Sequence, residues 1–83
     1  MNEELLKFRK KQLLVSFDNL QIKEEDRTPE RLIAMAEELE RRAKTLGTTH
    51  FAWAETITKM NKILDLALLV EQINLAESQQ KNK

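Results

Sequence analysis

The chain contains one proline, Pro29, and one glycine, Gly47, and these two residues constrain where its helices can begin and end. Proline fits the first turn of a helix but breaks its interior, and glycine commonly closes a helix C-terminus. The rest of the sequence is rich in leucine, glutamate, lysine, alanine and glutamine, which favour helix. The sequence therefore predicts an all-α protein with three helices over about residues 2–21, 29–46 and 49–77, followed by a frayed tail at 78–83.

Polar residues next to the two breakers supply capping signals. Thr28 can accept a hydrogen bond from the backbone as the N-cap of the second helix, with Pro29 at its first position. Gly47 can adopt the left-handed conformation that ends this helix. Thr48 or Thr49 is then expected to cap the third helix.

Length and charge place the chain as one domain, residues 1–83. Fourteen basic residues balance fourteen acidic ones, so there is no global field to attract nucleic acid or acidic lipid. Cysteine is absent, which excludes a disulfide framework and favours a reducing, intracellular setting.

The N-terminus is acidic, unlike a signal peptide, and the longest apolar run, Ile63–Val70, is too short to span a bilayer. We expect a cytoplasmic protein that does not contact membranes.

Apolar residues at helical spacing predict which faces are buried. The second helix has one stripe, composed of Leu32, Met35, Leu39, Ala43 and Leu46. The first helix has two stripes: Leu6, Leu13, Phe17 and Leu20, and separately Leu5, Phe8, Val15 and Ile22. The third helix also has two stripes: Trp53, Ile57, Met60, Leu64, Ala67 and Leu68, and separately Ile63, Leu66, Leu69, Val70 and Ile73. We expect the first stripe of each helix to form the core of the protomer, which leaves the second stripes for a partner.

Helix length supports the same expectation. The third helix should be about 45 Å long and the other two about 30 Å, so roughly ten of its residues would project beyond a three-helix antiparallel bundle. A second copy of the chain could cover them and make a six-helix dimer. The expected interface residues are Leu5, Phe8, Val15, Leu66, Leu69, Val70 and Ile73.

Catalytic, metal-binding and cofactor-binding patterns do not stand out in the sequence. His50 is the single histidine, and without cysteine or a second histidine it lacks the companions of a metal site or of an activated nucleophile. We expect it to lie at the surface or near a helix cap. The sequence therefore predicts no catalytic residue, no metal and no cofactor, which is typical of a protein that is not an enzyme.

The segment Ala43-Lys44-Thr45-Leu46-Gly47 resembles the centre of a Cro- or repressor-type helix-turn-helix. In that motif the alanine allows two helices to approach and the glycine makes the turn. The resemblance implies a DNA-binding regulator of a phage or plasmid, with contacts from Arg41, Arg42, Lys44, Thr48, Thr49 and His50. The exposed side of the following helix has no arginine or lysine before Lys59, so it offers no cationic side chain there to bind the DNA phosphates.

The apolar surplus favours another function. A small helical protein can act by burying an apolar helix face against a partner, as adaptors, inhibitors and regulators do. The leading hypothesis is a non-enzymatic protein-protein interaction module that forms a homodimer and binds a further, unidentified protein. DNA binding is the alternative.

Overall fold

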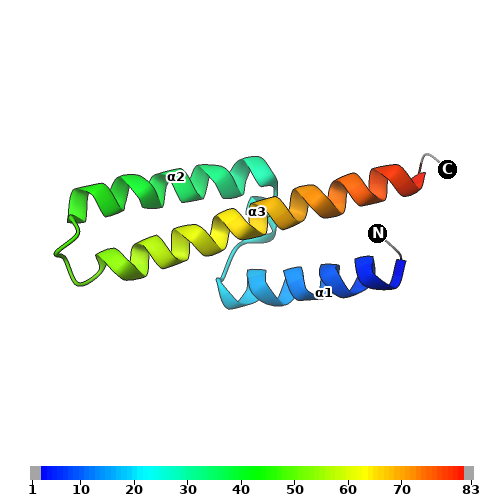
Figure 1. Ribbon diagram of the computed structural model, residues 1–83, viewed down its shortest axis with the longest axis horizontal. Helices are drawn as coiled ribbons and strands as arrows, with labels where there is room; N and C mark the ends of the chain where they lie inside the picture. Colours follow the sequence, from blue (N-terminus) through cyan, green and yellow to red (C-terminus); the bar gives the residue numbers. More distant parts are fainter. Residues whose placement is uncertain (1–2, 82–83) are drawn as a thin grey trace.

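The computed structural model describes the backbone of residues 3–81 and the side chains of residues 3–79. The order of elements is α1 (Glu3–Asn19), the short 3-10 helix η1 (Glu24–Asp26), α2 (Pro29–Leu46) and α3 (Trp53–Lys81). Both α1 and α2 run antiparallel to α3 and contact it (Figure 1). The prediction of an all-α chain with three helices and a long C-terminal helix is confirmed. The predicted frayed tail is helical up to Lys81, and residues 82–83 lie outside the described part of the chain.

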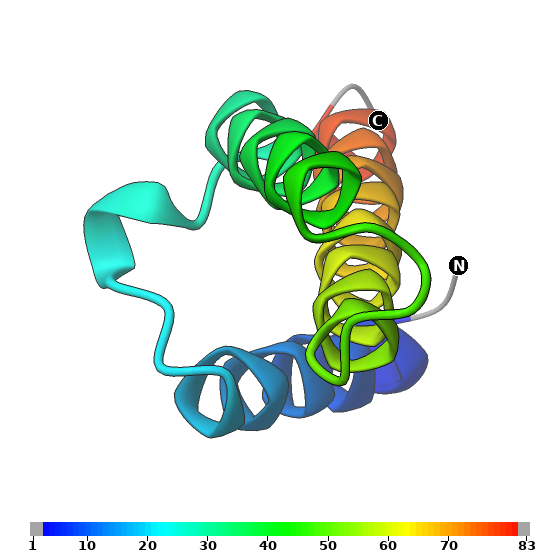
Figure 2. The same cartoon turned by 90° about the vertical axis from the view of Figure 1, so that its left-hand side faces the viewer.

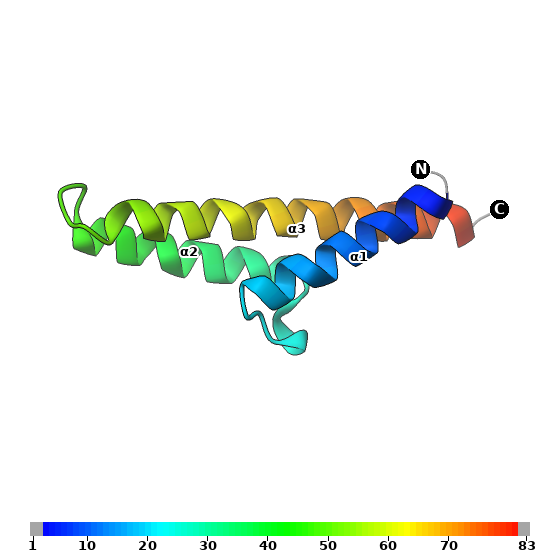
Figure 3. The same cartoon turned by 90° about the horizontal axis from the view of Figure 1, so that it is seen from below.

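The two shorter helices lie one after the other along α3. Figures 1 and 3 show α2 beside the N-terminal half of α3 and α1 beside its C-terminal half, and Figure 2 shows them on different sides of it. This stagger covers the C-terminal half of α3, which an unstaggered bundle would leave projecting. It also makes the molecule long, with extents of 52 × 20 × 19 Å. The radius of gyration is 15.0 Å, compared with about 12 Å for a compact chain of this length.

The second helix matches its predicted pattern. Thr28 is its N-cap, and the Thr28 hydroxyl accepts a hydrogen bond from the Arg31 N–H at 3.3 Å. Pro29 is the first helical residue, where its missing N–H costs nothing. The predicted stripe faces α3: Leu32 and Ala43 are buried, and Met35, Leu39 and Leu46 are partly buried, while Ala36, next to the stripe, is buried as well.

The turn between α2 and α3 differs in detail from the expectation. Gly47 has φ 81° and ψ 156°, and its N–H donates to the Ala43 carbonyl at 3.0 Å. The positive φ was expected, but this ψ lies outside the left-handed helical region, in a region that only glycine adopts readily. The chain then makes further turns, and α3 begins only at Trp53. Thr48 and Thr49 therefore lie in the turn and do not occupy the cap position next to the helix.

The end of α1 is closed without a glycine. Gln21 has a positive φ of 56°, and the Ile22 N–H donates to the Phe17 carbonyl at 2.9 Å. This six-residue hydrogen-bonded ring, together with a contact between the two apolar residues at its ends, is the Schellman motif. Ile22 and Phe17 belong to the same buried cluster. The motif therefore turns the chain out of α1 and anchors the turn in the core.

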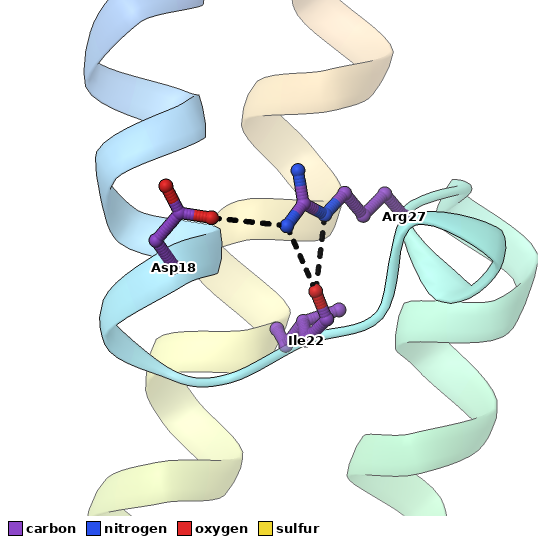
Figure 4. A network of polar contacts seen from close by, with 3 residues as sticks. All are labelled: Asp18, Ile22 and Arg27. Carbon is purple, nitrogen blue, oxygen red and sulfur yellow. Dashed lines mark hydrogen bonds and ion pairs between the residues drawn. The ribbon is translucent and has the colours of Figure 1, made fainter.

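Arg27 holds the connection between α1 and α2. Its guanidinium donates from Nε at 3.1 Å and from Nη2 at 2.9 Å to the Ile22 carbonyl (Figure 4). Nη2 also donates to Asp18 Oδ1 at 3.2 Å, and the guanidinium carbon lies 4.9 Å from the centre of the Phe17 ring. The planar, forked guanidinium can make these contacts together, which a lysine cannot do. Arg27 thus links the end of α1 to the start of α2.

The core lies where the three helices meet. Its main cluster consists of Phe17, Ile22, Leu32, Ala36, Ile63, Leu66, Ala67 and Val70. A smaller cluster, between α1 and the C-terminal half of α3, consists of Leu6, Ile73 and Ala76, with Leu13 and Leu69 packed against it. Burial of this apolar surface is the main force that holds the helices together.

The predicted orientation of α3 is right for Ala67, which is buried, and for Met60, which packs against the main cluster, but it is wrong for several other apolar residues of this helix. Ile63, Leu66, Val70 and Ile73, which were expected to remain on the surface, are buried, whereas Leu64 and Leu68 from the expected core stripe are exposed. The physical reason is that the two partner helices lie on different sides of α3. Its buried face turns from the α2 side around Ala67 to the α1 side around Ala76.

Within residues 3–81, no helix is both long enough and apolar enough to cross a membrane.

Candidate interaction surface

The outer face of α1, which comprises Leu5, Phe8 and Val15, is exposed. Phe8 is 57% and Val15 58% exposed, and Leu5 is 42% exposed. On the other side of the helix, Leu6 and Phe17 are buried against α3. The residues of the outer face are spaced three and then seven positions apart, so they line one side of the helix. The sequence placed these three residues on an interface with a partner, and in the protomer they are exposed.

The other predicted interface residues belong to the protomer itself. Leu66 and Val70 are buried in the main cluster and Ile73 in the smaller one, and Leu69 packs against the smaller one. They are not accessible to a partner while α1 stays in place. The expectation that they form a surface together with Leu5, Phe8 and Val15 is therefore corrected, because α1 itself covers them.

A second exposed apolar surface follows α3, and three of its residues, Ile57, Leu64 and Leu68, were expected in the core. This α3 stripe consists of Leu64, Leu68 and Leu75, which are exposed, and Ile57, which is partly buried. These residues are spaced seven, four and seven positions apart. Together with residues 61 and 71, which lie between them, these residues occupy the a and d positions of a heptad repeat, and this pattern was the signal that could have identified the stripe as a separate face.

The residues of the DNA-binding hypothesis lie near the turn between α2 and α3. Arg41, Arg42 and Lys44 are exposed; Arg41 and Lys44 are three positions apart and share one side of α2, whereas Arg42 lies about 100° around the helix from Arg41. Lys44 also pairs with Glu40 at 3.2 Å. They do not form one continuous basic surface.

Thr48, Thr49 and His50 are exposed in the turn itself. The Nδ1 atom of His50 accepts a hydrogen bond from the Ala52 N–H at 3.0 Å, so this side chain has a local structural role just before α3. The helices on either side run antiparallel, side by side (Figure 1). A DNA-binding helix-turn-helix instead joins two helices at a steep angle of about 90–120°. DNA binding stays a prediction with no support from this geometry.

Phe51 is the most exposed large hydrophobic residue of the described chain, at 90%. It lies at the end of the α2–α3 hairpin, where its ring stacks on His50 with a centroid distance of 4.5 Å. The stack orders two neighbouring side chains of the turn. A single exposed aromatic residue does not make a continuous surface, so the two helix faces remain the better candidates for an interaction site.

Two grooves of the described part of the chain are open to solvent. The larger one, about 370 Å³, lies between α1 and α3 and is lined by Ser16, Asn19, Leu20, Lys62, Asp65 and Leu66. A smaller one, about 150 Å³, lies between α2 and α3 near Arg42 and Lys59. Among the described residues, no three histidine, cysteine or acidic side chains gather as metal ligands would. A ligand-binding cleft usually encloses most of the surface of its ligand, whereas both of these grooves are open to solvent.

Comparisons with protein-family models, curated proteins and solved structures found no match for this chain. The candidate surfaces therefore rest on the geometry and chemistry of the chain alone.

Proposed function

We propose that this protein is a small, non-enzymatic, cytoplasmic helical module that dimerises and binds a further protein through apolar helix faces. In such a role it would act as an adaptor, an inhibitor or a regulator. Its mechanism would be the burial of a helix face in the groove of a partner, where a few apolar side chains provide most of the affinity.

The exposed outer face of α1 carries this proposal. Leu5, Phe8 and Val15 follow the spacing of the anchor residues that a helix inserts into an apolar groove. Phe8 is the strongest candidate anchor, because burial of an aromatic side chain removes about 150–250 Å² of surface from water. The polar residue on the same face, Gln12, could make a hydrogen bond at the rim of such a groove.

A pull-down from the cells that produce the protein tests the binding of a partner. The bait would be the whole chain, compared with the double variant Phe8→Ser/Val15→Ser. The control would be Leu14→Ser, because Leu14 is also on α1 and is 54% exposed but lies on another side of the helix. We expect a protein that is retained by the unmodified chain and by the control and is lost with the double variant.

The double variant should keep its helical circular dichroism, since both residues are already exposed. If the same proteins bind all three baits, or if nothing is enriched by the unmodified chain, the outer face of α1 is not a binding site.

A further inference from the structure

The α3 stripe lies on a side of the helix that neither shorter helix covers. α2 packs against Ile63 and Ala67, and α1 packs against Ile73 and Ala76. Leu68 is 56% exposed and Leu75 62% exposed, although they lie beside these buried positions in the sequence. From Ile57 to Leu75 the stripe is about 27 Å long. An occupant of this face must therefore be an extended element of similar length, such as another helix.

The chain exposes more surface than a compact monomer of its mass, and the excess is large enough to be buried in an interface. A compact monomer of 9.8 kDa would expose about 5200 Å², whereas this chain exposes 6402 Å². The difference of about 1200 Å² exceeds the roughly 800 Å² that each partner buries in a stable interface of standard size. A second copy of the chain brings a stripe of the same length and chemistry.

We propose that two copies of the chain pair through their α3 stripes, side by side and antiparallel, with the two-fold axis passing near residue 66. In this register Leu64 of one copy faces Leu68 of the other, and Ile57 faces Leu75. Each contact then occurs twice, as two-fold symmetry requires. Pairing of an a position with a d position in each layer is the arrangement expected of antiparallel helices with a heptad repeat.

The two polar residues of the stripe select the antiparallel direction. Asn61 and Glu71 occupy the remaining positions of the repeat. Antiparallel pairing places the Asn61 amide opposite the Glu71 carboxylate, and an amide N–H₂ can donate to a carboxylate. Parallel pairing would place the two Glu71 side chains against each other, which is unfavourable because like charges repel in a partly buried seam.

This inference rests on the proposed function and identifies the surface that would make its dimer. It also assigns separate surfaces to the two interactions. The α3 stripe binds the second copy, and the outer face of α1 binds a different protein.

Sedimentation of the full chain at about 10–100 µM tests the surface, because a standard interface should be largely occupied at these concentrations. The unmodified chain should be a dimer. Leu68→Glu should weaken the association by at least about tenfold, since it would bury a charge in the seam. Leu14→Glu is the matched control, because Leu14 has nearly the same exposure, 54% against 56%, and should leave the dimer intact.

Disulfide trapping tests the register. Because the chain has no cysteine of its own, the introduced thiols are the only ones that can form a disulfide. Leu64→Cys and Leu68→Cys would be made separately and incubated in a glutathione redox buffer, alone and mixed. The antiparallel register predicts that the mixture forms a covalent dimer containing one copy of each variant. Efficient cross-linking of each variant to itself would show parallel pairing and overturn the register.

The outcomes separate this inference from the broader proposal. A dimer that survives Leu68→Glu but is lost in Phe8→Ser/Val15→Ser would mean that the chain dimerises through α1, so the α3 stripe would be wrong while dimerisation stands. A monomeric unmodified chain would overturn the dimer altogether. The partner captured through Phe8 and Val15 would then be the remaining part of the proposed function.

Discussion

The α2–α3 hairpin and α1 use their apolar residues differently, although α1 and α2 are nearly equal in length. α2 has 18 residues and buries Leu32, Ala36 and Ala43 against α3. α1 has 17 residues and buries only Leu6 and Phe17, while four of its large apolar side chains are exposed. The difference indicates that α2 serves mainly to build the core, whereas α1 combines a modest core contribution with an accessible apolar surface.

The same difference predicts unequal local stability. A helix with few buried contacts opens more readily than its neighbours, without unfolding of the whole domain. We therefore expect α1 to detach before the hairpin separates. Such opening would also expose Leu66, Val70 and Ile73, which α1 and its following turn help to cover.

The largest expected effect comes from truncation of the hairpin core. Leu32→Ala removes a fully buried side chain of α2 and should lower the free energy of unfolding by about 3 kcal/mol, because a cavity is left among well-packed neighbours. Urea denaturation followed by circular dichroism measures this loss. A decrease below about 1 kcal/mol would mean that the hairpin is not the stable part of the molecule.

The matching change in α1 is Leu6→Ala, in the smaller cluster with Ile73 and Ala76. We expect a loss of about 2 kcal/mol, at the lower end for such substitutions, because the site is close to solvent and can partly collapse. Native-state hydrogen exchange should become faster for the amides of α1 than for those of α2. Equal acceleration in both helices would contradict the idea that α1 opens separately.

Arg27→Lys tests the joint between the two regions. Lysine keeps the positive charge but loses the paired donation to the Ile22 carbonyl and the planar contact over Phe17. The free energy of unfolding should decrease by about 1 kcal/mol, the usual contribution of such hydrogen bonds. Arg31→Lys, at an exposed position of α2, is the control and should change little. Equal effects of the two substitutions would argue against a special role of Arg27.

A stabilising substitution is expected at the end of α1. Gln21 holds a positive φ that is costly for residues with a β-carbon. Gln21→Gly should therefore raise the free energy of unfolding by about 0.5 kcal/mol, after the flexibility that glycine adds to the unfolded chain is subtracted. Thermal denaturation should show a higher midpoint. Gln12→Gly, in the middle of the same helix, should have the opposite sign.

The smallest expected effect concerns the ion pair between Lys10 of α1 and Glu77 of α3. Both side chains are partly exposed, so water and salt screen their attraction. Glu77→Gln should cost about 0.3 kcal/mol at low salt, and less at high salt. A double-mutant cycle with Lys10→Met measures the coupling. A coupling above about 1 kcal/mol would contradict this expectation and would show that the ion pair is a main contribution to the attachment of α1.

The hairpin was the part of the fold that sequence reasoning predicted best. A single apolar stripe in α2, with Thr28 and Pro29 before it and Gly47 after it, left little choice of boundary or buried face. The position of the third helix start was less certain, because several residues after Gly47 could turn. The start at Trp53 depends on hydrogen bonds within the turn, including the one that His50 accepts.

The buried face of α3 could not be predicted from periodicity alone. Both of its stripes have the spacing of a buried face, and the choice between them depends on where two separate helices dock. Because α1 and α2 are staggered, the buried side changes along α3. The predicted interface was therefore only partly accessible. Leu5, Phe8 and Val15 are exposed, whereas Leu66, Val70 and Ile73 are buried inside the protomer. The Schellman turn at Gln21 carried no sequence signal, since its central residue is not glycine.

The stagger of the two short helices also determines how the molecule rotates in solution. α3, about 43 Å long, is nearly aligned with the longest dimension of 52 Å (Figure 1). Its N–H bonds lie nearly parallel to this long axis, so only the slower end-over-end tumbling reorients them, and their ¹⁵N relaxation rates should differ from those of the Lys23–Arg27 connection. Antiparallel pairing about residue 66 would double the mass while adding little length. The diffusion tensor would then become more isotropic, whereas end-to-end association would make it less so.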